Sequence, residues 1–319
     1  MTLNIQQTLH DWYQENGRKT LPWRLTTDAY HIYVSEVMLQ QTQVKTVLER
    51  FYFPFLEAFP SLEALANANL EEVLKMWQGL GYYSRARNLH RAAQIVAPHL
   101  PQKIEELIAL PGIGKNTAHA IAALAFHQSV PVMEANVKRI LSRFFALTNP
   151  TPNELWDCAH KLLNCEDPFT HNQAMMDIGA LVCTPKNPDC RQCPLRSGCA
   201  GKETPERYPE KKVKKAIPIR QYHIFLHYNS QHQLYLEART TRFLNGMYGF
   251  DQQDPTQVLP DNAKAIGQVT HQYSHFTLKA DIFVLASTKK QHYTRQEINA
   301  LPLSGADEKA LLLWDNWVK

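Results

Sequence analysis

The sequence lacks any apolar run that approaches the roughly 18 residues a helix needs to cross a bilayer. The segment from Met1 to Gln14 lacks the pattern of a signal peptide. We find no internal repeat and no low-complexity tract. These absences exclude a helical membrane protein and a repeat architecture. They lead us to expect a cytoplasmic protein without contact with membranes.

Charge of either sign is not in large excess. The 319 residues carry a formal net charge of +4 at pH 7, and the sequence pI is about 8.6. This modest basic balance is compatible with a nucleic-acid partner but does not establish one, because many cytosolic proteins share it. The length predicts two domains, each able to bury its own core.

Cysteine is scarce, yet four of the six cysteines lie close together in the chain. Gaps of six, two and five residues separate Cys183, Cys190, Cys193 and Cys199. Four thiolates in so short a segment can surround one soft metal centre, and their unequal gaps favour a cubane iron–sulfur cluster. A structural zinc site, which prefers paired cysteines two residues apart, and disulfide pairs are the alternatives.

The chain changes character near residue 200. Residues 1–201 show apolar residues at helical spacing between short turns, with Ser61 and Asn153 as expected helix caps. Residues 202–215 are charged and contain two prolines, which indicates a linker. Residues 216–319 predict a smaller α+β domain.

Three elements of the smaller domain can be predicted individually. Alternating apolar residues over 222–238, with a polar turn in the middle, predict a β-hairpin. Residues 278–286 predict a further strand and residues 307–318 a closing helix.

A glycine-containing turn separates two predicted helices at residues 110–115. Gly112 and Gly114 permit a tight turn whose backbone N–H groups point outward at a helix N-terminus, followed by Lys115 and Asn116. Such a turn can bind a phosphate, although it can also be a simple connection between helices.

The glycine turn followed by the four-cysteine loop resembles the helix-hairpin-helix DNA glycosylases of the endonuclease III superfamily. Within it, residues 21–24, 35–43, 79–88 and 172–179 look like the MutY-type adenine DNA glycosylases. The resemblance implies a mainly α, helix-hairpin-helix glycosylase fold with a [4Fe-4S] cluster loop, plus a Nudix-like C-terminal domain. It also implies a monomeric, nucleoid-associated enzyme of base excision repair that acts on double-stranded DNA containing 8-oxoguanine:adenine or guanine:adenine mispairs.

Release of adenine requires an acid, because adenine is a poor leaving group as an anion. Glu36 lies between apolar residues of a predicted helix, where burial would raise its pKa and keep it protonated. The resemblance implies that Glu36 is this acid and later helps to activate water.

The second carboxylate departs from the family pattern. The family carries Asp-Gly before an asparagine, whereas this chain reads Glu134, Ala135 and Asn136. Glu134 keeps the charge that would stabilise a cationic sugar but moves it outward by one methylene. We expect a working Glu134 supported by Asn136, and a catalytically weakened mismatch- or lesion-binding protein is the alternative.

Strand cleavage is not expected. The superfamily members that cut the strand carry a lysine directly before the threonine of the hairpin turn, and this chain has Asn116 there. Lys115 is one residue early and would point about 100° away on a helix. A monofunctional glycosylase is therefore favoured over an endonuclease III-like enzyme.

The remaining site residues follow from the resemblance. Trp23 and Arg24 resemble residues beside the adenine pocket. Gln41 and Tyr82 occupy positions whose family counterparts enter the duplex and contact the oxidised guanine opposite adenine, and Leu80 is a further candidate wedge there. Ser274 and His275 match the segment that reads 8-oxoguanine, although Tyr273 stands where the family has phenylalanine. The domain lacks the glutamate-rich signature of Nudix hydrolases, so we expect it to recognise and not to hydrolyse.

Overall fold

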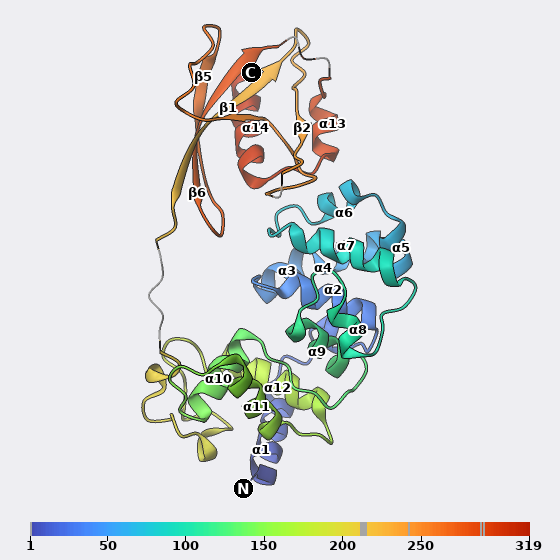
Figure 1. The fold of residues 1–319 in the computed structure, drawn as a ribbon, viewed down its shortest axis with the longest axis vertical. Coiled ribbons are helices and arrows are strands. Elements are labelled where there is room, and N and C mark those ends of the chain that lie inside the picture. The colour runs from blue at the N-terminus through green and yellow to red at the C-terminus, as the bar shows by residue number, and fades with distance from the viewer. Residues whose placement is uncertain (1, 211–215, 242, 288, 290) are drawn as a thin grey trace. The chain divides into compact units, whose positions relative to one another are not determined.

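A computed structural model describes residues 2–210, 216–241, 243–287, 289 and 291–319 (Figure 1). The chain forms two compact units. The first unit comprises Met1–Ala66 and Arg91–Val213, and the second comprises Asn67–His90 and Lys214–Lys319. In the described part of the chain, no helix combines the length and apolar character that a membrane span needs.

The first unit is built from helices. They are α1 (Thr2–Asn16), η1 (Pro22–Arg24), α2 (Ala29–Leu39), α3 (Val44–Arg50), α4 (Tyr52–Ala58), α5 (Leu62–Asn67), α8 (Ile104–Ile108), α9 (Lys115–Leu124), α10 (Ala135–Phe144), α11 (Pro152–Leu162), α12 (Pro168–Leu181), η2 (Arg196–Gly198) and η3 (Pro205–Arg207). The second unit contributes α6 (Leu70–Met76) and most of α7 (Ser84–Val96).

Side-chain caps explain where several helices begin. The prediction for Ser61 is confirmed, because its hydroxyl accepts a hydrogen bond from Ala64 N at 3.1 Å. The prediction for Asn153 is wrong: Thr151 caps α11, in a reciprocal arrangement with Glu154, and Pro152 takes the first helical position. Thr151 was the better candidate because a hydroxyl three residues before a glutamate can satisfy two backbone donors.

Two packed groups of helices position the site of the first unit. Helices α1, α10, α11 and α12 share a core that includes Leu9, Leu141, Ala174 and Ile178, each at most 2% exposed. Helix α2 packs on α9, which also contacts α8 and α12 (Figure 1). The apolar contact between α2 and α9 thus fixes the position of α2, the helix that carries Glu36.

The second unit contains a four-stranded sheet with the order β4-β1-β6-β5. Its strands are β1 (Ile219–Tyr228), β4 (Asp251–Gln253), β5 (Lys264–Gln272) and β6 (Thr277–Ala286). Helix α14 (Gly305–Val318) packs on β5 and β6. A short pair, β2 (Glu237–Ala238) with β3 (Tyr248–Gly249), and helix α13 (Arg295–Ala300) complete the unit.

The strand predicted over 278–286 and the helix predicted over 307–318 are confirmed as β6 and α14. The hairpin predicted over 222–238 forms only near its turn, where Tyr228 and Leu234 form an antiparallel bridge and Tyr235 N donates to His227 O at 2.8 Å. Along the rest of its length, β1 pairs in parallel with β6 and antiparallel with β4 instead. Alternation reports that a strand has a buried face, but it does not identify the partner strand.

The segment Asn67–His90 packs with C-terminal residues inside the second unit. Gln78 Oε1 accepts a hydrogen bond from Leu303 N at 3.2 Å, and Arg87 Nη1 donates to Asn245 O at 2.7 Å. The first part of the predicted linker packs on the first unit, where Arg143 Nε donates to Pro205 O at 2.9 Å. Residues 211–215 of that linker lie outside the described residues.

Candidate active site

A cavity of about 190 Å³ in the first unit brings together five residues predicted from the sequence: Trp23, Arg24, Glu36, Glu134 and Asn136. They come from η1, α2 and the start of α10, and α12 supplies a further part of the lining. A pocket of mixed polar and apolar lining with two acidic side chains can both bind a base and transfer a proton.

Glu36 has a strongly raised pKa in this cavity. It lies near the C-terminal end of α2, whose other residues are mostly buried. Burial, and then the nearby charge of Glu134, raise the pKa of Glu36 to about 7, while Arg24 opposes this shift. A carboxyl group with this pKa can hold a proton near neutral pH and give it up to a basic atom.

Glu134 is held by its neighbours at the N-terminus of α10. Asn136 Nδ2 donates a hydrogen bond to Glu134 Oε1 at 3.1 Å, and Arg139 Nη2 donates to Asn136 Oδ1 at 2.9 Å. Burial raises the pKa of Glu134, whereas the hydrogen bond from Asn136 and the charges of Arg18, Arg24 and Arg139 work against that rise. The pKa of Glu134 stays raised, and the amide donor and the three cations limit the rise that burial causes.

The asparagine of this pair lies against α12. A Cβ atom added at Gly179 would lie 2.5 Å from Asn136 Cβ. Arg139 Nη2 also donates to Gly179 O at 2.7 Å, and Arg139 Nε donates to Cys183 O at 2.8 Å. Glycine at position 179 therefore allows the close helix contact that fixes the position of Asn136.

Sequence reasoning missed a buried ion cluster on the wall of the cavity. Asp177 on α12 is fully buried and accepts hydrogen bonds from Arg18 Nη2 and Arg24 Nη1, both at 2.6 Å. Burial alone would raise the pKa of Asp177, but the hydrogen bonds and charges of Arg24 and Arg18 outweigh it and lower that pKa. This ion cluster fixes the guanidinium groups of Arg18 and Arg24 beside the two glutamates.

The glycine turn is formed as predicted, between α8 and α9. Gly112 has a φ of +76°, which favours glycine, and Gly114 is the N-cap of α9. Asn116 is exposed at the start of α9. Lys115 Nζ lies 4.1 Å from the ring centroid of Trp156, in a cation–π contact.

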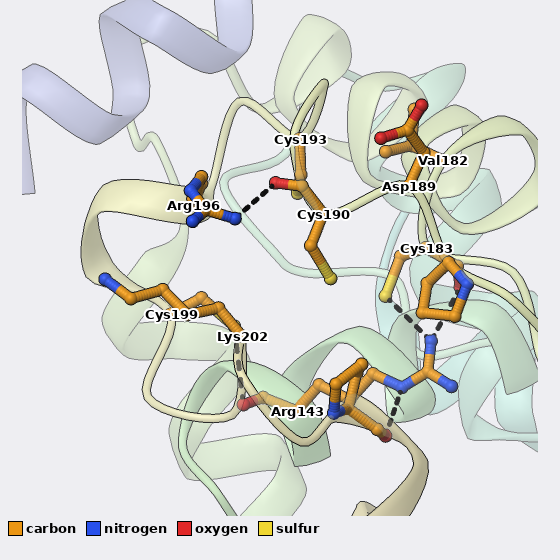
Figure 2. A pocket seen from close by; sticks show the side chains of 11 residues that line it. Arg143, Val182, Cys183, Asp189, Cys190, Cys193, Arg196, Cys199 and Lys202 are labelled. Atoms are coloured by element: carbon orange, nitrogen blue, oxygen red, sulfur yellow. Dashed lines mark hydrogen bonds between the residues drawn. The ribbon is translucent and has the colours of Figure 1, made fainter.

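The four cysteines line one pocket of the first unit, together with Arg143, Arg196 and Lys202. Figure 2 shows the sulfurs of Cys183 and Cys190 directed into the same space. In the described residues, no three Cys, His, Asp or Glu side chains are close enough to hold a metal ion as they stand. Four cysteines lining one pocket are nevertheless the set of soft donors that an iron–sulfur cluster requires.

The charges around this pocket suit anionic sulfur. Arg143 Nη1 lies 3.3 Å from Cys183 Sγ, as a dashed line in Figure 2 shows. Burial raises the pKa of Cys193 to about 12, so that its free thiol is neutral at pH 7. A metal centre would deprotonate such thiols, and the neighbouring cations would compensate the resulting negative charge.

A second pocket lies within the second unit. It is lined by Tyr82 from the turn before α7, by Ser274 and His275 from the turn between β5 and β6, and by Phe243. Tyr82 is 41% exposed and has a φ of +51°. The sequence did not single out Phe243, because nothing local marks an aromatic residue in a loop as part of a pocket.

Two further residues from the resemblance lie elsewhere. Leu80 is only 6% exposed and lies in the core of its unit. Gln41 is exposed, has a φ of +57° and follows α2 in the first unit. Gln41 belongs to the first unit, whereas Leu80 and Tyr82 belong to the second.

Comparison with known proteins agrees with the helical fold and with the glycine turn between α8 and α9. The family model described as HhH-GPD superfamily base excision DNA repair protein matches residues 34–165. The structure of a thermostable thymine-DNA glycosylase superposes with a TM-score of 0.57 at 27% identity, covering 62% of this chain and 94% of that one. An endonuclease III in a non-covalent DNA complex gives a TM-score of 0.54 at 19% identity, over 65% and 99% of the two chains, and so shares the fold. The class is therefore that of the helix-hairpin-helix base excision repair proteins.

Sequence similarity to curated proteins, over most of the chain, identifies the family within this class. An adenine DNA glycosylase of Buchnera aphidicola subsp. Schizaphis graminum is 35% identical over 303 residues, which cover 87% of this chain and 86% of that protein. The human adenine DNA glycosylase is 43% identical over 218 residues, 63% of this chain and 40% of that protein. The chain belongs to the family of adenine DNA glycosylases.

Proposed function

We propose that this protein is a monofunctional adenine DNA glycosylase of base excision repair. It flips adenine out of a duplex in which adenine faces 8-oxoguanine or guanine, and it hydrolyses the bond between the base and deoxyribose. The observation that carries the proposal is one cavity holding Glu36, with a pKa of about 7, beside Glu134. Family membership supplies the substrate class.

The chemistry divides between the two glutamates. Glu36 donates its proton to a ring nitrogen of adenine, so the electron pair of the breaking C–N bond leaves on a neutral base. Positive charge develops on the sugar, and the carboxylate of Glu134 stabilises it. Glu36, now ionised, accepts a proton from the water that attacks the sugar carbon, which regenerates the acid.

Asn136 and the two arginines support this division. The hydrogen bond from Asn136 holds one oxygen of Glu134, which limits the freedom that the longer side chain of glutamate would have compared with aspartate. Arg24 and Arg18 place fixed positive charge near Glu134 and favour its ionised form. We therefore favour an active enzyme over a binding-only protein.

The absence of an amine at position 116 supports hydrolysis without strand cleavage. A Schiff base with the sugar needs a lysine amine, and Asn116 offers only an amide. The nearest amine in sequence, Lys115, contacts the ring of Trp156.

We propose that Cys183, Cys190, Cys193 and Cys199 hold a [4Fe-4S] cluster. When bound, the cluster cross-links the loop and supplies no step of the hydrolysis. The loop would then present its basic residues to the DNA backbone. Arg143, which contacts Cys183 and the following backbone, holds the loop against α10.

For the second unit, we propose that Ser274 and His275 read the base opposite adenine, with Tyr82 entering the duplex. The pocket that these residues share supports the proposal. Residues 216–319 would act as a Nudix-like recognition domain without hydrolase activity, attached through residues 202–215 to the glycosylase domain of residues 1–201.

The test is Glu36→Gln, assayed by single-turnover release of adenine from an 8-oxoguanine:adenine duplex. We expect excision to be lost while duplex affinity stays near that of the wild type, since glutamine is isosteric but is not an acid. Excision within tenfold of wild type would exclude Glu36 as the acid.

Borohydride trapping provides the second arm of this experiment. Borohydride added during turnover should trap no covalent protein–DNA complex. Efficient trapping would show that an amine attacks the sugar and would contradict the monofunctional assignment.

A further inference from the structure

The residues proposed to read the lesion lie on an exposed turn. Tyr273 N donates to Phe276 O at 2.9 Å across this turn between β5 and β6. The side chains of Ser274 and His275 are exposed, and Ser274 Oγ lies 3.3 Å from His275 Nδ1. A hydroxyl that must meet one base edge requires a support that limits the motion of the turn.

Tyr273 is the residue of this turn that connects it to the interior. Its ring contacts three aromatic rings: His271 at 4.5 Å between centroids, Phe276 at 4.9 Å and Phe243 at 5.0 Å. Its hydroxyl lies 3.3 Å from Ser304 Oγ. The ring is therefore held on several sides, and the hydroxyl adds a directional contact that a phenylalanine would not make.

Ser304 belongs to a buried polar network. It is the N-cap of α14, is 1% exposed and donates a hydrogen bond to Asp307. Asp307, also 1% exposed, accepts two hydrogen bonds from Arg239, at 2.8 Å and 2.9 Å. Removing one partner of such a buried ion pair costs free energy of folding, because the other charge stays buried without compensation. The network is therefore a rigid anchor.

We propose that Tyr273 is a positioning residue for lesion reading, whose hydroxyl anchors the Ser274–His275 turn to the buried Ser304–Asp307–Arg239 network. This inference rests on the proposed function. Tyr273 does not itself need to contact the base. It fixes the position of Ser274. Its hydroxyl therefore affects the preference for the lesion but not the excision chemistry.

The direct test is Tyr273→Phe, which keeps the ring contacts and removes only the hydroxyl. The readout is the ratio of single-turnover excision rates for 8-oxoguanine:adenine and guanine:adenine duplexes. We expect the ratio to fall about threefold to tenfold, in line with the loss of one hydrogen bond of ordinary strength. The guanine:adenine rate and the melting temperature should stay close to those of wild type.

A matched control is Tyr235→Phe. Tyr235 OH donates to Glu237 Oε2 at 2.7 Å in an exposed pair of the same unit, so this variant also loses one tyrosine hydroxyl bond, but away from the turn. Its ratio should equal that of wild type. A fall in the control ratio as large as that of Tyr273→Phe would overturn the proposal.

A double-mutant cycle separates positioning from a general structural role. If Tyr273 acts through Ser274, then Tyr273→Phe should have little further effect in a Ser274→Ala background. Additive effects would overturn the proposal, as would an unchanged ratio in Tyr273→Phe.

The same experiment distinguishes failure of the proposed function from failure of the Tyr273 inference. A wild-type protein that releases no adenine contradicts the proposed function itself. A wild-type protein that releases adenine and prefers the lesion, with the same preference in Tyr273→Phe, contradicts the Tyr273 inference alone.

Discussion

Substitution of Gly179 by alanine tests the packing that holds Asn136 beside Glu134. The added Cβ would lie 2.5 Å from Asn136 Cβ and 3.3 Å from Asn136 Cα. Ordinary contacts of a Cβ atom begin near 3.4 Å, so α10 and α12 must separate locally by about 1 Å. The neighbour is a short side chain close to the backbone and cannot swing away.

The expected effect is larger on excision than on stability. Overpacking costs about 1–3 kcal/mol, while alanine recovers about 1 kcal/mol of helix propensity relative to glycine. A net loss of about 0–2 kcal/mol leaves the fold intact. In contrast, a shift of about 1 Å in Asn136 and Glu134 costs on the order of a hundredfold in the rate of the chemical step.

The assay is single-turnover adenine release, with thermal unfolding and duplex affinity measured on the same preparation. We expect Gly179→Ala to unfold cooperatively, to bind the duplex like wild type and to excise adenine about a hundredfold more slowly. An excision rate within threefold of wild type would refute the view that the contact between Gly179 and Asn136 positions the site.

Three further predictions concern charge and metal. Burial raises the pKa of Glu36 to about 7, so ionisation of Glu36 destabilises the fold as the pH rises from the pKa of an unfolded glutamate toward 7. Glu36→Gln should therefore raise the melting temperature more at pH 8 than at pH 5. An equal change at both pH values would contradict the raised pKa. Asp177→Asn leaves Arg18 and Arg24 without their buried counter-charge and should lower the free energy of unfolding by about 3 kcal/mol, measured by urea unfolding. Cys193→Ser should lower the iron content and weaken duplex binding; stoichiometric zinc without iron in wild-type protein from iron-rich medium would overturn the cluster proposal.

The sequence predicts the helical first unit, the glycine turn and the strand and helix that end the second unit. These features depend on local periodicity and on residues that are neighbours in the chain. Glu36, Glu134 and Asn136 could also be proposed, because motif resemblance identifies positions one by one. The structure adds that these three residues share a cavity with Trp23 and Arg24.

Features that depend on distant contacts could not be predicted. Asp177 lies 159 residues from Arg18 and 153 from Arg24, and no local pattern marks it as their partner. The β-hairpin predicted over 222–238 forms only near its turn for a related reason: β1 instead forms a ten-residue parallel ladder with β6, which lies far away in the sequence.

The arrangement of the second unit also changes how lesion reading should be tested. Deleting residues 216–319 would remove the partners of Gln78 and Arg87 as well as Ser274 and His275. Any loss after truncation would therefore mix recognition with the packing of Asn67–His90. Point variants in the β5–β6 turn are the cleaner experiment.

The central claim is that one protonated and one ionised glutamate hydrolyse the bond to adenine. The most direct measurement is the release of free adenine from an 8-oxoguanine:adenine duplex in a single turnover, with wild type and Glu36→Gln compared at matched duplex affinity. The account predicts that wild type releases adenine and leaves an abasic site in an uncut strand, whereas Glu36→Gln releases none. A wild-type protein that binds the duplex tightly without releasing adenine would contradict the account and identify a mismatch-binding protein instead.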